Sequence, residues 1–142
     1  MQGLAPGEPP GQGRHGMTQY LISFGVHAMD HIPDEDMAAV AKAAHAVIQE
    51  ALDAGVYVLA GGLDDQPASI VATDGTVSDG PYPEFVSGLT VVEVPSRGDA
   101  LKWAAKMAVA CRCAQEVRAI GHDPELDAMV GEAGGRLHAD GA

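Results

Sequence analysis

The sequence is poor in aromatic residues and in cysteine. It holds two phenylalanines, three tyrosines and one tryptophan, so the core has to be built mainly from aliphatic side chains and methionine. The only cysteines, Cys111 and Cys113, stand at a spacing that rarely forms a disulfide because the local geometry is strained. No CxxC pair indicates a zinc site. We therefore expect free, structural thiols, which fit a reducing cytoplasm.

Positive charge is also scarce. Eight lysines and arginines face twenty acidic residues, for a formal net charge of -12. This balance argues against nucleic acid and anionic membranes as partners, because both are bound through basic side chains. No apolar run approaches the roughly 18 residues of a membrane span, and the N-terminus lacks the pattern of a secretory signal. The sequence predicts a cytoplasmic protein.

The chain is long enough for one domain with additional ends. Residues 1–16 are dominated by glycine and proline and offer little to bury. They are interpreted as a disordered leader, an upstream translation start or a cloning remnant, with Met17 as an alternative start. Residues 17–121 carry the periodic patterns of a folded domain.

Residues 122–142 are expected to form a tail. Leu126, Met129 and Val130 could share one side of a short amphipathic helix of one or two turns. Gly134–Gly135 is expected to end it, and the residues beyond should fray.

The first half of the domain reads as a strand, a helix and a strand. Apolar residues alternate from Tyr20 to Val26, which predicts a strand. Pro33 and the acidic residues after it are typical of a helix start. An apolar stripe continues from Met37 to Leu52, and Gly55 suits the position after a helix end. Residues 56–60 are expected to form the second strand.

The second half begins at Gly61–Gly62, which is expected to break that strand. Asp74–Gly75 between two β-prone runs predicts a hairpin. Residues 86–94 form a long predicted strand, Ser96–Asp99 resembles a capping box that opens a second helix, and residues 116–120 close the domain as a strand. We summarise this order as β-α-β-β-β-α-β.

This order predicts an α+β fold. Two helices with small apolar faces suit one side of an antiparallel sheet, as in a ferredoxin-like two-layer sandwich. Residues 56–59 and 89–94 carry apolar side chains on both faces of their strands. A bare apolar face of this extent requires a cover, so we predict a homodimer in which a second copy packs on the sheet.

Four segments of the domain resemble the YCII-related family. They are His45–Leu63, Val77–Tyr82, Asp99–Ala105 and Glu116–Arg118, and the second is similar to the motif of the DGPF-type branch. The likeness spans about residues 18–121. It implies a dimeric α+β barrel made of two ferredoxin-like halves.

The resemblance also implies a site. Members of this family are suspected enzymes because a histidine on the first helix and an aspartate lie near a cleft, and the matching residues here are His45 and Asp79. An imidazole at the edge of an apolar stripe can exchange a proton at neutral pH, although such a residue can also be purely structural. Asp79 before Gly80 can simply accept backbone N–H groups in a turn. Tyr82 replaces the phenylalanine of the DGPF motif.

Further residues are expected to line the same cleft. Gly61 and Gly62 would form one wall, with Asp64, Asp65 and Tyr82 nearby. The two aspartates could equally be solvated loop acids, and the phenol of Tyr82 could donate a hydrogen bond or pack as phenylalanine would.

A second set of polar residues has an H-x-x-D-H spacing. His27, Asp30 and His31 could ligate a metal, but the neighbouring glycine and proline favour a solvated loop. Gly61–Gly62 belongs to no GxGxxG or Walker motif, the sequence contains no HExxH, and no metal or other cofactor is predicted.

Two functions remain open. The first is a small enzyme in which His45 and Asp79 act as an acid–base pair on a small polar organic molecule, in a lyase-like or hydrolytic reaction. The second is a non-catalytic metabolite-binding or regulatory dimeric module. The first is the main prediction, and the feature in favour of the second is that no complete catalytic constellation is visible in the sequence.

Overall fold

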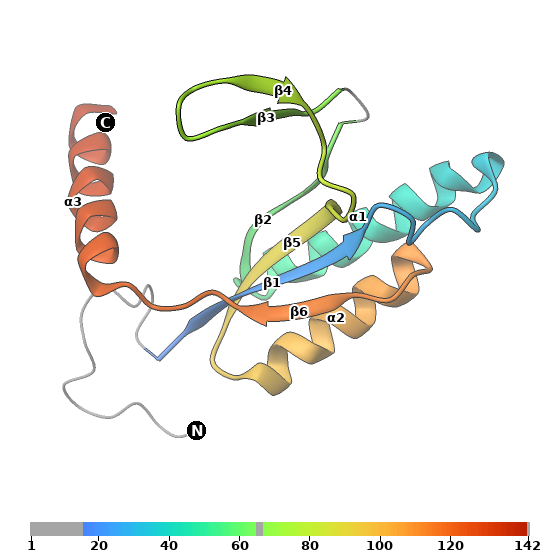
Figure 1. Ribbon diagram of the computed structural model, residues 1–142. Coiled ribbons are helices and arrows are strands. Elements are labelled where there is room, and N and C mark those ends of the chain that lie inside the picture. Colours follow the sequence, from blue (N-terminus) through green and yellow to red (C-terminus); the bar gives the residue numbers. More distant parts are fainter. Residues whose placement is uncertain (1–15, 65–66, 142) are drawn as a thin grey trace.

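The computed structural model describes residues 16–64 and 67–141, and Figure 1 shows their arrangement. The expected leader therefore lies, except for Gly16, outside the described residues. The elements in chain order are β1 (Thr18–Gly25), a 3₁₀ turn (Asp34–Asp36), α1 (Met37–Asp53), β2 (Tyr57–Gly62), β3 (Ser69–Val71), β4 (Val77–Asp79), β5 (Val86–Val94), α2 (Arg97–Cys111), β6 (Glu116–Ala119) and α3 (Pro124–Gly141).

The main sheet is antiparallel, with strand order β2-β5-β1-β6. Helices α1 and α2 both lie on one face of this sheet, while β3 and β4 form a separate ribbon (Figure 1). The molecule is therefore a mixed α+β protein, compatible with the ferredoxin-like arrangement expected from the sequence.

Three features of these elements differ from the sequence-based expectation. Four strands lie between α1 and α2, because each arm of the hairpin around Asp74–Gly75 is a strand of its own. β2 continues through Gly61–Gly62, whose backbones pair with Leu89 and Gly88 of β5. α3 runs through Gly134–Gly135 to Gly141. A glycine weakens a helix by only about 1 kcal/mol relative to alanine, so it need not end one.

The helix boundaries around the sheet follow local rules. Pro33 precedes the 3₁₀ turn, and α1 begins at Met37. Gly55 has a φ of +74°, a conformation that favours glycine after a helix end, as expected. The Ser96 hydroxyl oxygen accepts the backbone N–H of Asp99 at 3.1 Å and donates to the Asp99 carboxylate at 3.0 Å. Ser96 is thus the N-cap of α2, as the sequence predicts.

The core has two parts. One joins the sheet to α2, where Ile22 and Val92 pack against Ala100 and Ala104. The other joins the two helices, where Val47 of α1 packs among the buried α2 residues Met107, Ala110 and Cys111. Alanines on α2 let that helix approach the sheet closely, whereas α1 contributes no residue to the buried sheet cluster.

Phe24 and Gly88 are cross-strand partners on the helix-covered face of the sheet. A Cβ atom added at Gly88 would lie 2.3 Å from the Phe24 ring, so only glycine fits beneath this ring. The Phe24 ring therefore lies directly against the backbone of Gly88, at one end of the space between the sheet and the helices.

Among the described residues, no helix covers the opposite face of the sheet (Figure 1). The strand register places Leu21 and Leu59 beside Val91, and Leu89 beside Ser23, on this face. Leu59 is 48% exposed. The sheet is thus apolar on both sides, as the sequence indicates. Among the described residues, no helix has the length and apolarity needed to cross a membrane.

Candidate functional site

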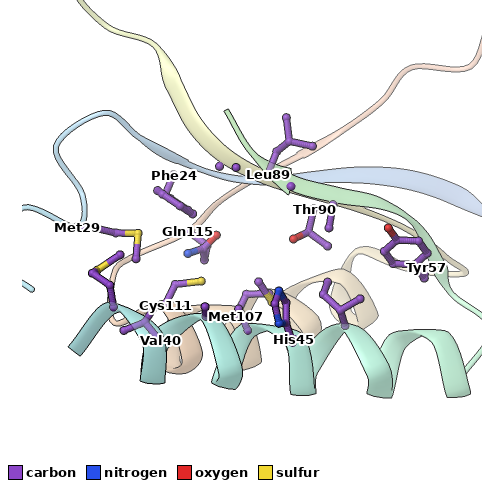
Figure 2. Close-up of a pocket in the computed structure, with 18 residues that line it drawn as sticks. Phe24, Met29, Val40, His45, Tyr57, Leu89, Thr90, Met107, Cys111 and Gln115 are labelled. Atoms are coloured by element: carbon purple, nitrogen blue, oxygen red, sulfur yellow. The ribbon is translucent and has the colours of Figure 1, made fainter. Parts of the chain in front are cut away.

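A cavity of about 440 Å³ lies between α1 and the sheet (Figure 2). Helix α1 forms its floor, β5 and β2 form its roof, and the last turns of α2 close one side. Cavities of this size accommodate small organic molecules.

The cavity exists because both its floor and its roof carry small residues. On the floor, Ala41 and Ala44 occupy positions of α1 that face the sheet, and on the roof Ala60, Gly62 and Gly88 line the space. Larger side chains at these positions would fill the gap between the layers. A Cβ added at Gly62 would meet only the backbone oxygen of Ser87 at 3.9 Å, so this part of the roof is not crowded.

The lining is mostly apolar and rich in sulfur. Met29, Met37, Met107 and Cys111 all contribute to it. Burial raises the pKa of the Cys111 thiol, and the nearby Cys113 raises it further, so the thiol stays protonated at neutral pH. The described residues around the cavity include no aspartate, glutamate, lysine or arginine.

Four polar side chains interrupt this apolar lining: those of His45, Tyr57, Thr90 and Gln115 (Figure 2). Thr90 is only 4% exposed, and its hydroxyl has no hydrogen-bond partner among the described residues. The Gln115 amide donates from Nε2 to the backbone carbonyl of Cys113 at 3.3 Å. A buried and unpaired hydroxyl is unusual, because most buried polar groups are hydrogen-bonded.

His45 projects from α1 toward the sheet, from the wall opposite to Thr90 (Figure 2). Its side chain lines the cavity and is exposed to solvent, which places it at the opening. Within the described part of the chain, the imidazole has no hydrogen bond or ion pair. It could therefore contact a molecule that enters without first losing an internal partner.

The structure separates the other predicted site residues. Gly61 and Gly62 line the cavity together with His45, whereas Asp64, Asp79 and Tyr82 are not among its lining residues. Asp65 lies outside the described residues.

Asp79 ends β4, pairs with Ser69 and is exposed. Tyr82 is 67% exposed. Both belong to the segment around the separate ribbon, which does not join the main sheet. The DGP loop, expected at the cleft with His45, contributes no lining residue to the cavity between α1 and the sheet. A joint role for His45 and Asp79 therefore has no geometric support at this site.

The H-x-x-D-H residues form a surface contact. His27 Nδ1 lies 2.8 Å from a carboxylate oxygen of Asp30, and both side chains are highly exposed. In the part of the chain that the structure describes, no three His, Cys, Asp or Glu side chains gather as metal ligands do. This pair therefore gives no reason to propose a metal centre.

Sequence reasoning missed Thr90 and the sulfur-rich wall. Thr90 shares a strand face with Val92 and Val94, both buried. A lone hydroxyl on the buried face of an otherwise apolar strand is a visible signal in the sequence. The grouping of Met29, Met107 and Cys111 was not visible, because it depends on how a loop and α2 meet at the cavity.

Comparison with known proteins adds no identity: no protein-family model matches the chain, and no curated protein matches it.

Proposed function

We propose that the cavity between α1 and the sheet binds a small, neutral, mainly apolar organic molecule. The observation that carries the proposal is the buried hydroxyl of Thr90, which has no partner among the described residues and faces a mainly apolar cavity. Ligand sites typically combine apolar walls with a few polar groups that orient the ligand. A charged ligand would find no opposite charge among the described lining residues, and burial of an unpaired charge is costly.

This proposal favours the metabolite-binding alternative of the sequence analysis, with one change in the ligand. A small polar molecule was expected, but the aliphatic, aromatic and sulfur side chains of the cavity suit a ligand with a larger apolar part.

Ala41 and Ala46 offer a matched pair for testing the site. Both are exposed on α1, but only Ala41 lines the cavity. Ala41→Trp should block the cavity and weaken binding of the neutral dye N-phenyl-1-naphthylamine at least about tenfold, a loss of roughly 1.4 kcal/mol. Ala46→Trp should bind the dye as the unmodified chain does. Fluorescence titration measures both affinities.

Equal dye binding by the two tryptophan variants would place the dye elsewhere, for example on the open sheet face, and would contradict the proposal. The same holds if the unmodified chain shows no saturable binding. Circular dichroism of both variants verifies that the added indole has not unfolded α1.

A second candidate function is proton transfer by His45. This imidazole is the lining group best suited to exchange a proton at neutral pH, and it reaches the cavity from its opening. The resemblance to the YCII-related family favours the same residue. His45 would remove a proton from a carbon beside a carbonyl group and return one from solvent, without help from Asp79.

Deuterium exchange tests this chemistry without knowledge of the natural substrate. The neutral ketone 2-tetralone loses protons beside its carbonyl group, and NMR in D₂O follows their replacement. If His45 is the base, the chain should accelerate exchange by about 100-fold or more over buffer, and His45→Gln should abolish the effect.

His31 is an exposed histidine outside the cavity, so His31→Gln is the control and should retain full exchange activity. Retained activity in His45→Gln would rule out His45 as the base. Unchanged binding of N-phenyl-1-naphthylamine by His45→Gln would show that the lost activity is chemical and not a loss of the cavity.

We further propose that two copies of the chain pack through their open sheet faces, as in the dimeric α+β barrel that the family resemblance implies. The support is the apolar face on which Leu59 is 48% exposed, which it shares with the partly buried Leu21 and Leu89 and the buried Val91. Such a face in water is unfavourable, and a symmetric second copy is a common cover.

Light scattering on a size-exclusion column tests this assembly. The unmodified chain should have twice the 14.6 kDa mass of one copy. Leu59→Glu, on the open face, should shift it to the single mass because a buried unpaired charge destabilises the interface by several kcal/mol. Val109→Glu, at an 81% exposed position on α2, should leave the dimer intact. A single-copy mass for the unmodified chain would contradict this assembly.

A further inference from the structure

The two ends of the cavity have different chemistry (Figure 2). At one end, Met29 and Cys111 lie near Phe24, together with Gln115, whose amide donates to the backbone carbonyl of Cys113, and Met107 lies between this end and His45. Further along, the hydroxyls of Thr90 and Tyr57 reach toward the space from the sheet, and His45 reaches it from α1. A ligand that satisfies both regions needs an apolar end and a polar end.

The sulfur-rich end selects for a particular kind of apolar group. Thioether and thiol sulfurs are polarisable and make favourable contacts with the edges and faces of aromatic rings, in addition to the burial of apolar area. Phe24 offers its own ring to a second aromatic group. An aromatic ring therefore gains contacts here that a saturated ring of the same size does not.

Thr90 defines the polar end. The side chain is 4% exposed, it lines the cavity, and no described residue hydrogen-bonds its hydroxyl. Its cross-strand partner on the same face is the fully buried Ile22, whose side chain offers no acceptor or donor. A hydroxyl both donates and accepts, and either a hydroxyl or a carbonyl oxygen of a ligand would satisfy it.

We propose that the cavity takes a neutral aromatic molecule that carries one hydroxyl or carbonyl oxygen. Its ring lies against Met29, Met107, Cys111 and Phe24, and its oxygen hydrogen-bonds the Thr90 hydroxyl. The ligand class rests on the proposed binding function, and it adds both the kind of ring and the residue that selects the oxygen.

Three probes of similar size separate these features: 2-naphthol has the ring and the oxygen, 2-methylnaphthalene has only the ring, and trans-2-decalol has only the oxygen on a saturated ring. Calorimetry should give 2-naphthol an affinity about tenfold higher than that of 2-methylnaphthalene, the effect of one desolvated hydrogen bond. It should exceed the affinity for trans-2-decalol by about threefold or more, the effect of the sulfur contacts.

Thr90→Val replaces the hydroxyl by a methyl group of nearly the same volume. In this variant the preference for 2-naphthol over 2-methylnaphthalene should fall to about twofold or less, while 2-methylnaphthalene binds as before. Thr90→Ser keeps a hydroxyl and should keep the preference. Thr73→Val, at an exposed position of the ribbon turn, is the matched control and should behave as the unmodified chain.

Two results would overturn the ligand class and leave the binding function intact. One is a preference for 2-naphthol that survives in Thr90→Val, which would exclude Thr90 as the selecting residue. The other is tighter binding of trans-2-decalol than of 2-naphthol, which would exclude the aromatic ring. If none of the three probes and no N-phenyl-1-naphthylamine binds, the binding function fails together with the ligand class.

Discussion

The packing of α1 against α2 is the constraint on which the cavity depends. Val47 of α1 is buried with Met107 and Ala110 of α2, whereas the sheet core is completed by α2 alone. Two exposed ion pairs, each at 3.0 Å, lie on the outside: Lys106–Glu50 joins the helices, and Arg112–Asp36 joins the residue after α2 to the residue before α1. Exposed pairs of this kind contribute little free energy, so the buried apolar contacts of Val47 with α2 are the main interaction between the two helices.

Small residues keep the space between α1 and the sheet open, and its few polar side chains can form hydrogen bonds with a ligand. Alanine on α1 and glycine on the roof leave volume that close packing would normally fill. Thr90 carries a hydroxyl that nothing in the described fold satisfies. These features cost stability, and their combination in one place is typical of a binding site, where a ligand supplies the missing contacts.

The sequence predicted much of the fold and less of the site. Strand alternation around Ile22, the stripe on α1 and the cap at Ser96 are local patterns, and local patterns survive folding. The glycines at positions 61–62 misled the prediction because pairing with β5 overrides their weak strand propensity. Asp79 and His45 were joined by resemblance, and no local pattern could show that the hairpin forms a ribbon outside the main sheet.

The most direct measurement uses methionine as the reporter, because Met29, Met37 and Met107 line the cavity and Met129 lies exposed on α3. The chain labelled with ¹³C-methyl methionine would be titrated with 2-naphthol and followed by NMR. The account predicts saturable shifts of the three cavity methyl signals, with the Met129 signal unchanged. Shifts of Met129 alone, or no shift of the cavity signals at saturating 2-naphthol, would contradict it.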